Sequence, residues 1–306
     1  MDVDTRWVRT FVAVAEEGSL TLAAERLFVS QPALTKQVRR LEERLGVRLF
    51  TRSREGMALT EAGRAFAERA PALLAGVDGA VRAARGAERR AARVLHVGFI
   101  ASAANEATQD IIAAFGRVRP EWGVRLRQAA WSDPTAGLAD GGVDAALVRL
   151  PFPGQEAFRV DELLAEPRWV ALPAGHRLAG RERIAFRELW DEPFVAAPAG
   201  TGAWRDFWLG ADEREGRPPL VGATTDQPDE WLNAIASGFG VALAPASSAR
   251  FYARPGVVYR PVTGLSPSRV GVARPRDAHP VVRDFARCCR EAVGGGGPGT
   301  AADGVP

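Results

Sequence analysis

The segment from Gly18 to Leu45, GSLTLAAERLFVSQPALTKQVRRLEERL, constrains the chain most, because it predicts two short helices joined by a tight turn. In the second helix, apolar residues recur at steps of four, three and four, as on one face of a helix of period ~3.6: Leu34, Val38, Leu41 and Leu45. At ~100° per residue the opposite face carries Pro32, Thr35, Lys36, Arg39 and Arg40. A helix that packs by one face and offers hydroxyl, ammonium and guanidinium groups on the other suits the DNA major groove. The segment therefore predicts sequence-specific DNA binding.

The positive charge of the chain is concentrated around this segment. Residues 1–90 hold 16 Lys/Arg and 12 Asp/Glu, a net of +4, whereas the remaining residues hold 24 and 25, a net of −1. Between Lys36 and Arg54 there are seven basic and two acidic residues. Most charge runs are simply solvated surfaces. Because this run coincides with the helical pattern, we interpret it as a local field that attracts phosphates.

The flanking residues extend the pattern to a winged helix-turn-helix. A helix expected over about residues 4–17 ends at Gly18, while Ser19 and Ser30 suit the caps of the next two helices. After Gly46, the sequence VRLFTRSREGMALT predicts two short strands around residues 53–56. The tip of that hairpin carries Arg52 and Arg54, which we expect near a DNA backbone or minor groove.

The 306 residues predict two or three domains. A long helix is expected over residues 61–92, ending in a polar hinge at 86–93, and its apolar stripe is so thin that pairing with a second copy is expected. From Val94 onward, strands and helices alternate, which predicts an α/β fold with parallel strands. Residues 293–306 are mostly small or polar and are expected to be disordered.

Several other classes of protein find no support in the residues. No run approaches the ~18 apolar residues of a membrane span, and the charged start MDVDTRWVRT is not laid out like a signal peptide, so we expect a cytoplasmic protein. The adjacent Cys288 and Cys289 have no metal-ligand spacing, and no HExxH, GxSxG or P-loop motif occurs. We therefore predict no catalytic residues, no metal and no cofactor. A plain exported solute-binding protein would not need residues 1–60, which argues against that class. A factor that binds DNA constitutively, without an effector, is an alternative that the sequence leaves open.

The first ~60 residues resemble the DNA-binding domain of LysR-type transcriptional regulators. The resemblance rests on AAERLFVSQPALTKQVRRLEERLGVRLFTRS and MALTEAG, with their Gln-Pro-Ala-Leu, Leu-Gly-Val-x-Leu-Phe-x-Arg and Leu-Thr-x-Ala-Gly patterns. The later chain is similar to the effector domain of the same family, with Gly-Phe near residue 98, Gly-Gly-Val-Asp-Ala at 141–145 and Gly-Phe-Gly-Val-Ala-Leu-Ala-Pro at 238–245.

The resemblance implies an α+β multidomain protein. A winged helix-turn-helix at 1–60 and a linker and dimerisation helix with its hinge at 61–92 would precede an effector-binding domain at 93–292 and the tail at 293–306. The effector domain would resemble periplasmic solute-binding proteins, with lobe I at 93–162 and 267–292 and lobe II at 163–266. A small-molecule effector would bind between the lobes and alter oligomer geometry on promoter DNA. The family usually forms homodimers through the long helix and homotetramers through the effector domains.

The resemblance also implies the DNA-contacting residues: Gln31, Pro32, Thr35, Lys36 and Arg39, with Arg52 at the wing. The chemistry agrees, because Lys36 can donate to guanine acceptors and Pro32 offers an apolar edge to a thymine methyl. We add Ser30 at the start of the helix. The guanidinium groups of Arg39, Arg40 and Arg54 are better suited to phosphate.

The effector-binding candidates are Ser102, Trp131, Ser132, Thr201, Gly202, Trp204 and Trp231. Ser102 and the Gly-Thr-Gly at 200–202 each follow a strand and precede a helix, where free N–H groups and the helix dipole favour an anion. The predicted fold places these two loops across the cleft from each other, which indicates a carboxylate-bearing effector. The other candidates lie in segments that line the cleft of the family, although core packing is an equal alternative for the tryptophans.

Overall fold

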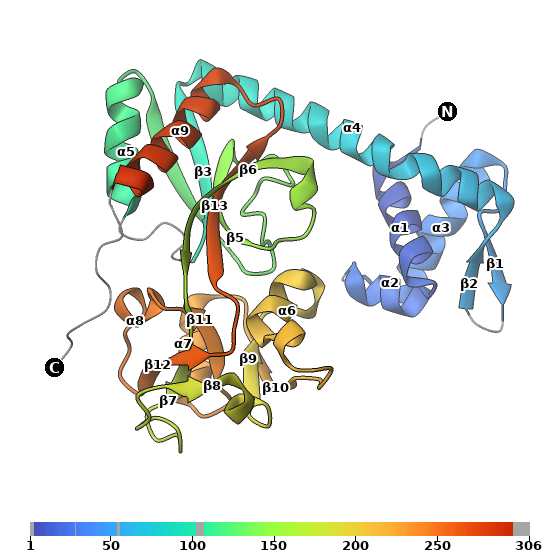
Figure 1. Ribbon diagram of the computed structural model, residues 1–306. Coiled ribbons are helices and arrows are strands. Elements are labelled where there is room, and N and C mark those ends of the chain that lie inside the picture. The colour runs from blue at the N-terminus through green and yellow to red at the C-terminus, as the bar shows by residue number, and fades with distance from the viewer. Residues whose placement is uncertain (1–2, 28, 54–55, 102–106, 296–306) are drawn as a thin grey trace. The chain divides into compact units, whose positions relative to one another are not determined.

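The computed structural model of the protein describes residues 3–27, 29–53, 56–101 and 107–295 (Figure 1). Backbone contacts divide the chain into two compact units, residues 1–84 and residues 85–306. The division falls inside one long helix, α4 (Glu61–Ala91).

The first unit begins with three helices, α1 (Thr5–Glu17), α2 (Leu20–Arg26) and α3 (Gln31–Leu45). Polar caps begin each helix: the side chains of Asp4, Ser19 and Ser30 accept hydrogen bonds from backbone N–H groups of the first turn. Gly18 and Gly46 end α1 and α3 in the left-handed conformation, with φ of 62° and 71°, which glycine adopts without a steric penalty. The helix starts and stops expected from the sequence are thus present.

The wing is the antiparallel hairpin of β1 (Phe50–Ser53) and β2 (Gly56–Leu59). A buried carboxylate on α3 fixes its start, because Glu42 accepts hydrogen bonds from the backbone N–H groups of Leu49 (2.8 Å) and Phe50 (3.2 Å). Behind it, the ring of Phe11 lies 5.2 Å from that of Phe50 and 5.0 Å from that of Phe66 on α4. The wing, the first helix and the start of α4 therefore share one apolar core.

The end of α4 belongs to the second unit and is tied to it by arginines. Arg89 forms a mostly buried ion pair with Asp144 (2.8 Å), and Arg85 donates to the carbonyl oxygen of Asp140. Residues 86–91, which the sequence predicts to be part of a polar hinge, are helical. The helix ends at Ala91, and a turn at residues 92–93, where Arg93 has a φ of 53°, leads into the next strand.

Lobe I of the second unit is a five-stranded sheet with the order β4-β3-β5-β13-β6. Its strands are β3 (Val94–Ile100), β4 (Gly123–Ala129), β5 (Ala145–Leu150), β6 (Phe158–Glu166) and β13 (Ser268–Pro275). Two helices, α5 (Ala107–Val118) and α9 (Pro280–Gly295), cover one face of this sheet, and the rings of Phe115 and Phe285 meet there at 5.5 Å (Figure 1).

Lobe II contains a four-stranded sheet with the order β11-β7-β12-β8 and a parallel pair, β9 with β10. The strands are β7 (Arg168–Pro173), β8 (Ile184–Ala185), β9 (Pro193–Ala196), β10 (Leu220–Thr224), β11 (Ala242–Pro245) and β12 (Val257–Thr263). The helices are α6 (Ala203–Leu209), α7 (Pro228–Ala236) and α8 (Ser248–Phe251). The chain crosses between the lobes twice, at Pro167 and at residues 264–267 (Figure 1).

The sheets correct one expectation from the sequence. The α/β alternation predicts parallel strands, but both main sheets are mixed, because β13 runs antiparallel to β5 and β6, and β7 runs antiparallel to β11 and β12. The two crossings cause this reversal, since each crossing strand enters the next lobe without an intervening helix. Residues 293–295, which the sequence predicts to be part of a disordered tail, are the end of α9, which continues to Gly295. Residues 296–306 lie outside the described residues.

Candidate DNA-binding surface and effector cavity

The exposed face of α3 gathers most of the predicted DNA contacts. Gln31, Pro32, Thr35, Lys36 and Arg39 line one shallow concavity, and Arg40 is exposed beside them. Leu34, Val38 and Leu41 are buried on the opposite face, so the helix can turn only this polar side to a partner. Arg52 lies on β1, and Arg54 lies outside the described residues.

Two hydroxyl groups on this face are already engaged with the backbone. The Thr35 hydroxyl donates to the carbonyl oxygen of Gln31 (2.9 Å), which leaves its oxygen free to accept. The Ser30 hydroxyl accepts from the N–H of Ala33 (3.4 Å), which leaves its proton free to donate. The surface thus offers an acceptor at Thr35 and donors at Ser30, Lys36 and the arginines.

A cavity of about 60 Å³ lies between the lobes of the second unit. Lobe I contributes the ends of β3 and β5 and Trp131, two residues after β4, and lobe II contributes residues of β9, β11, α6, α7 and α8 and their ends. The lining residues are Ile100, Ala101, Trp131, Arg149, Val195, Ala197, Trp204, Trp208, Pro228, Trp231, Leu243, Ala244, Pro245, Ser248 and Tyr252. Apart from a few polar groups, the lining is apolar and aromatic, as in most small-molecule sites.

Tryptophan rings form the wall where the lobes meet. The ring of Trp131, from lobe I, lies 6.2 Å from that of Trp204 and 6.0 Å from that of Trp231, both from lobe II. Trp204 in turn contacts Trp208 at 6.1 Å on the same helix. Such spacings are typical of favourable ring contacts, so this wall joins the lobes as well as lining the space.

The cation in the cavity lining is Arg149 of β5, which is only 2% exposed. Its guanidinium donates to Glu166 at the first crossing (3.0 Å) and to the Ser268 hydroxyl after the second (2.9 Å). The other side of the Glu166 carboxylate accepts from the N–H of Ser247 in lobe II (2.8 Å). Burial lowers the pKa of Arg149 from its ordinary value, and the charge of Glu166 opposes that shift.

Three N–H donors of the lining residues have no hydrogen-bond partner within the described chain: Arg149 Nε, Trp204 Nε1 and Trp208 Nε1. Leaving a buried donor unsatisfied costs about 1–3 kcal/mol, so such groups are uncommon without a reason. Among the lining residues that the structure describes, side-chain hydroxyls belong to Ser248 and Tyr252. Burial raises the pKa of Tyr252, so its hydroxyl is protonated at neutral pH. The residues that line the cavity are therefore rich in hydrogen-bond donors.

The predicted effector residues fall into three groups. Trp131, Trp204 and Trp231 line the cavity, whereas Ser102 lies outside the described residues. The remaining three, Ser132, Thr201 and Gly202, are not lining residues; the Thr201 hydroxyl is buried and donates to the carbonyl oxygen of Pro198 (2.8 Å). Sequence reasoning missed Arg149, Trp208 and Tyr252. An arginine inside the otherwise apolar strand DAALVRL was a usable indication of the first.

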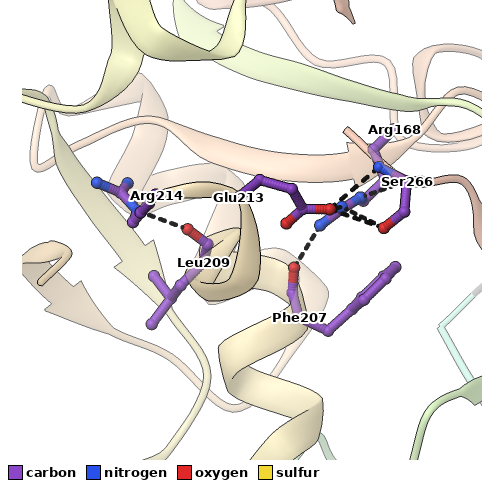
Figure 2. Close-up of polar contacts among 6 residues, drawn as sticks. All are labelled: Arg168, Phe207, Leu209, Glu213, Arg214 and Ser266. Atoms are coloured by element: carbon purple, nitrogen blue, oxygen red, sulfur yellow. Dashed lines mark hydrogen bonds and ion pairs between the residues drawn. The ribbon is translucent and has the colours of Figure 1, made fainter. Parts of the chain in front are cut away.

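A buried ion pair positions the helix that carries Trp204 and Trp208. Arg168, at the first residue of β7, is fully buried and donates to the carbonyl oxygen of Phe207 near the end of α6 (2.5 Å). Figure 2 shows the same guanidinium meeting Glu213 and Ser266, to which it also donates (2.8 Å to Ser266 Oγ). Ser266 belongs to the second crossing, so both crossings are tied to α6.

Arg214 acts on the same helix from the other side (Figure 2). It is fully buried, donates through Nε to the carbonyl oxygen of Leu209 (2.9 Å) and lies over the ring of Phe194 at 4.7 Å. Carbonyl groups at the end of a helix lack helical partners, and cations stabilise them. Two arginines therefore hold the end of α6 and, with it, one wall of the cavity.

Comparisons with known proteins agree with this architecture. Residues 5–64 match the family model "Bacterial regulatory helix-turn-helix protein, lysR family", and residues 88–294 match "LysR substrate binding domain". Together these matches cover both units, and the second alone covers more than half of the chain. The chain therefore belongs to the LysR family of transcriptional regulators.

Individual relatives give the same answer. The chain is 32% identical to the "Uncharacterized HTH-type transcriptional regulator YnfL" of Escherichia coli over 82% of this chain and 84% of that protein. It is 30% identical to the "Hca operon transcriptional activator HcaR" of Escherichia coli, over 94% and 98%. The solved structure of full-length CbnR complexed with its target DNA has the same fold, with a TM-score of 0.51 at 24% identity over 95% of this chain and 99% of that one.

The protein is thus a LysR-type transcriptional regulator with a helix-turn-helix DNA-binding domain and an effector-binding domain. Its relatives are regulators and not enzymes, which confirms the expectation of no catalytic activity. No group of three or more His, Cys, Asp or Glu side chains within the described ranges could hold a metal ion. In the same part of the chain, no helix is both long and apolar enough to cross a membrane.

The ion pair at α6 makes the stability of the effector unit depend on pH. Burial alone would raise the pKa of Glu213, but hydrogen bonds from Ser266 and the charge of Arg168 outweigh it and hold the pKa below its ordinary value of 4.5. A carboxylate with a lowered pKa in the folded state stabilises it above the unfolded pKa, and this contribution disappears as pH falls through the folded value. We therefore expect Glu213→Gln to reduce the loss of stability between about pH 5 and pH 3.

Urea unfolding at several pH values, with the free energy of unfolding as the readout, measures this effect. The matched control is Glu182→Gln, which neutralises an exposed glutamate of the same lobe. The wild-type protein and the control should lose stability in parallel as pH falls, and the Glu213 variant should lose less. Parallel curves for all three proteins would contradict a stabilising role for the Glu213 charge.

Proposed function

We propose that this regulator binds promoter DNA through the exposed face of α3 and responds to a small effector that carries a carboxylate or a similar acceptor group. The observation that carries the proposal is the set of three buried, unpaired donors on residues that line one aromatic cavity, Arg149 Nε, Trp204 Nε1 and Trp208 Nε1. The regulator acts where its promoter DNA is, so we also infer a cytoplasmic location.

The assignment of DNA contacts follows the hydrogen-bonding capacity of each side chain. Lys36 is exposed in the centre of the concavity and can donate to guanine N7 and O6. Because its proton is committed to Gln31, the Thr35 hydroxyl is better suited to accept from the amino group of adenine or cytosine. Gln31 and Pro32 complete the base-facing set, and Ser30, Arg39, Arg40, Arg52 and Arg54 contact phosphates.

We expect Lys36→Ala to weaken binding to the cognate operator by about 1–3 kcal/mol while leaving non-specific binding nearly unchanged, because one base contact is lost. Arg40→Ala should instead weaken binding to all sequences alike and reduce the slope of affinity against salt by about one, because a phosphate contact is lost. Operators are first identified by selecting genomic DNA fragments on the purified protein, and affinities are then measured at several salt concentrations.

The control variant is Arg6→Ala, which removes an exposed arginine that is engaged with Asp4 at the start of α1. Its operator affinity should match that of the wild type. If Lys36→Ala weakened cognate and random DNA equally, Lys36 would be a phosphate contact and the proposed assignment would be wrong.

The effector proposal rests on matching donors with acceptors. A carboxylate accepts several hydrogen bonds and carries the charge that Arg149 attracts, whereas the tryptophans offer flat apolar walls and two further N–H donors. The cavity is about 60 Å³, well below the several hundred Å³ of common ligand sites, so a whole effector requires the lobes to separate somewhat. The open alternative is a factor that binds DNA without any effector.

We expect the protein to bind phenylacetate more tightly than the uncharged phenylacetamide, as measured by isothermal titration calorimetry. Arg149→Lys should reduce the ratio of the affinities for phenylacetate and phenylacetamide about tenfold, because lysine lacks the Nε–H donor and the planar guanidinium group. The control is Arg269→Lys on β13, whose half-exposed side chain pairs with Glu162. Equal affinities of the wild type for the acid and the amide would argue against a carboxylate effector.

Assembly through α4 is the third part of the proposal. The middle of this helix exposes large apolar side chains at helical spacing, Leu73, Val77 and Val81, with 45%, 37% and 40% of their surfaces accessible. An exposed apolar stripe of this kind indicates a partner surface, and a second copy of the same helix is self-complementary. We infer a homodimer through α4, which further effector-domain contacts would extend to a homotetramer.

We expect Val77→Glu to shift the protein toward monomers, because it places a charge in the centre of the stripe. Size-exclusion chromatography with light scattering measures the mass directly. The control, Ala75→Glu, also introduces a glutamate at an exposed position of α4, but away from the stripe. If the Val77 variant kept the mass of the wild-type protein, the stripe would not be the interface.

A further inference from the structure

A direct polar contact crosses the mouth of the cleft, beside the cavity. The carboxylate of Asp226 in lobe II accepts hydrogen bonds from the backbone N–H of Ser132 in lobe I (2.6 Å) and from the Ser132 hydroxyl (2.8 Å). A backbone hydrogen bond adds to this contact: the N–H of Trp131 donates to the carbonyl oxygen of Asp226 (3.0 Å). We call these three residues, Trp131, Ser132 and Asp226, the cleft latch.

The latch closes the cavity as well as joining the lobes. The polar contact of Ser132 fixes the neighbouring Trp131, whose ring lies between Trp204 and Trp231 of lobe II. On the other side, the N–H of Asp226 donates to Glu230 Oε2 (3.1 Å), which ties the aspartate to α7 and hence to Trp231. Both walls therefore approach each other when the latch forms, which agrees with the small cavity volume.

The donors of Ser132 are arranged as a carboxylate site. An N–H and an O–H from one residue meet the two oxygens of one carboxylate, Oδ1 and Oδ2. Hydrogen bonds to a charged acceptor are stronger than neutral ones, so this pair of donors selects a carboxylate over an amide or a hydroxyl. In the structure the carboxylate comes from the chain itself. Ser132 is exposed, so a dissolved carboxylate can reach it from outside.

We propose that Asp226 is an intramolecular competitor: it occupies Ser132 and holds the lobes closed until the carboxylate of an effector displaces it. The inference rests on the proposed carboxylate effector and adds a mechanism for its response. An entering carboxylate takes the two Ser132 donors and releases Asp226, which frees Trp131 from its place between the lobe II tryptophans. The cleft thus opens in the same step in which the effector is recognised, because the effector carboxylate replaces the Asp226 carboxylate at the Ser132 donors.

The first part of the test uses the full-length protein without any ligand. Asp226→Ala should raise amide hydrogen exchange at Trp131 and Ser132 and increase acrylamide quenching of tryptophan fluorescence, because both contacts of the Asp226 carboxylate are lost. The matched control is Asp229→Ala, which removes the same charge three residues away, from a side chain that is 95% exposed and 3.7 Å from Arg254. Unchanged exchange and quenching in the Asp226 variant would overturn the latch.

The second part uses phenylacetate and phenylacetamide as probes in calorimetry. Asp226→Ala should bind phenylacetate about tenfold more tightly than the wild type, since the competing carboxylate is gone, with no comparable gain for the amide. Ser132→Ala should weaken the latch, because the hydroxyl contact to Asp226 is lost, but gain no affinity, because it also removes a donor of the site. Asp229→Ala should stay within about twofold of the wild type.

The outcomes separate the two proposals. If Asp226→Ala raised the affinities for phenylacetate and phenylacetamide equally, the proposed competition for Ser132 would be wrong. It would also be wrong if Asp229→Ala raised the affinity for phenylacetate as much as Asp226→Ala. If the latch opens in the ligand-free test but no variant binds phenylacetate better than phenylacetamide, the latch is supported and the proposed effector class is contradicted.

Discussion

The effector unit depends on buried arginines at the two chain crossings between its lobes. Arg149 joins lobe I to the first crossing through Glu166, and Arg168 joins both crossings to α6 through Ser266 and the carbonyl oxygen of Phe207. A charge without a partner is costly inside a protein, so each guanidinium requires its acceptors to stay in place. Since α6 also supplies Trp204 and Trp208, the same ion pairs that connect the lobes determine the shape of the cavity between them.

The two ends of this regulator are organised by different forces. The DNA-binding unit is arranged by an apolar core behind α3, which leaves the polar face of that helix to bind a nucleic acid. The effector unit places its polar groups inside, around a cavity that is rich in donors and at a latch that closes it. A surface of cations suits a polyanion, whereas a few enclosed donors suit a single small acceptor. Between them, α4 is long, continuous and exposes an apolar stripe.

Local sequence rules predicted the DNA-binding unit well because its structure is determined by neighbours in the chain. Caps, glycine stops and the period of Leu34, Val38 and Leu41 place α3 and its exposed face without reference to distant residues. The cavity depends on contacts between residues far apart in sequence. Ser132 was predicted to contact the effector, but its donors meet Asp226, 94 residues away, and the partners of Arg149 lie 17 and 119 residues from it, at Glu166 and Ser268.

The sequence by itself determined the class of fold, the helix boundaries of the first unit, the membership of the LysR family and the side of α3 that is free. These follow from short-range propensity and from patterns of fixed spacing. The tertiary structure decided the mixed parallel and antiparallel directions of the strands, the helical end of α4 and which side chains meet in the cleft. The reason is that partners such as Arg168 and Ser266 are brought together only when both crossings form, and the energy of burying a charge depends on everything around it.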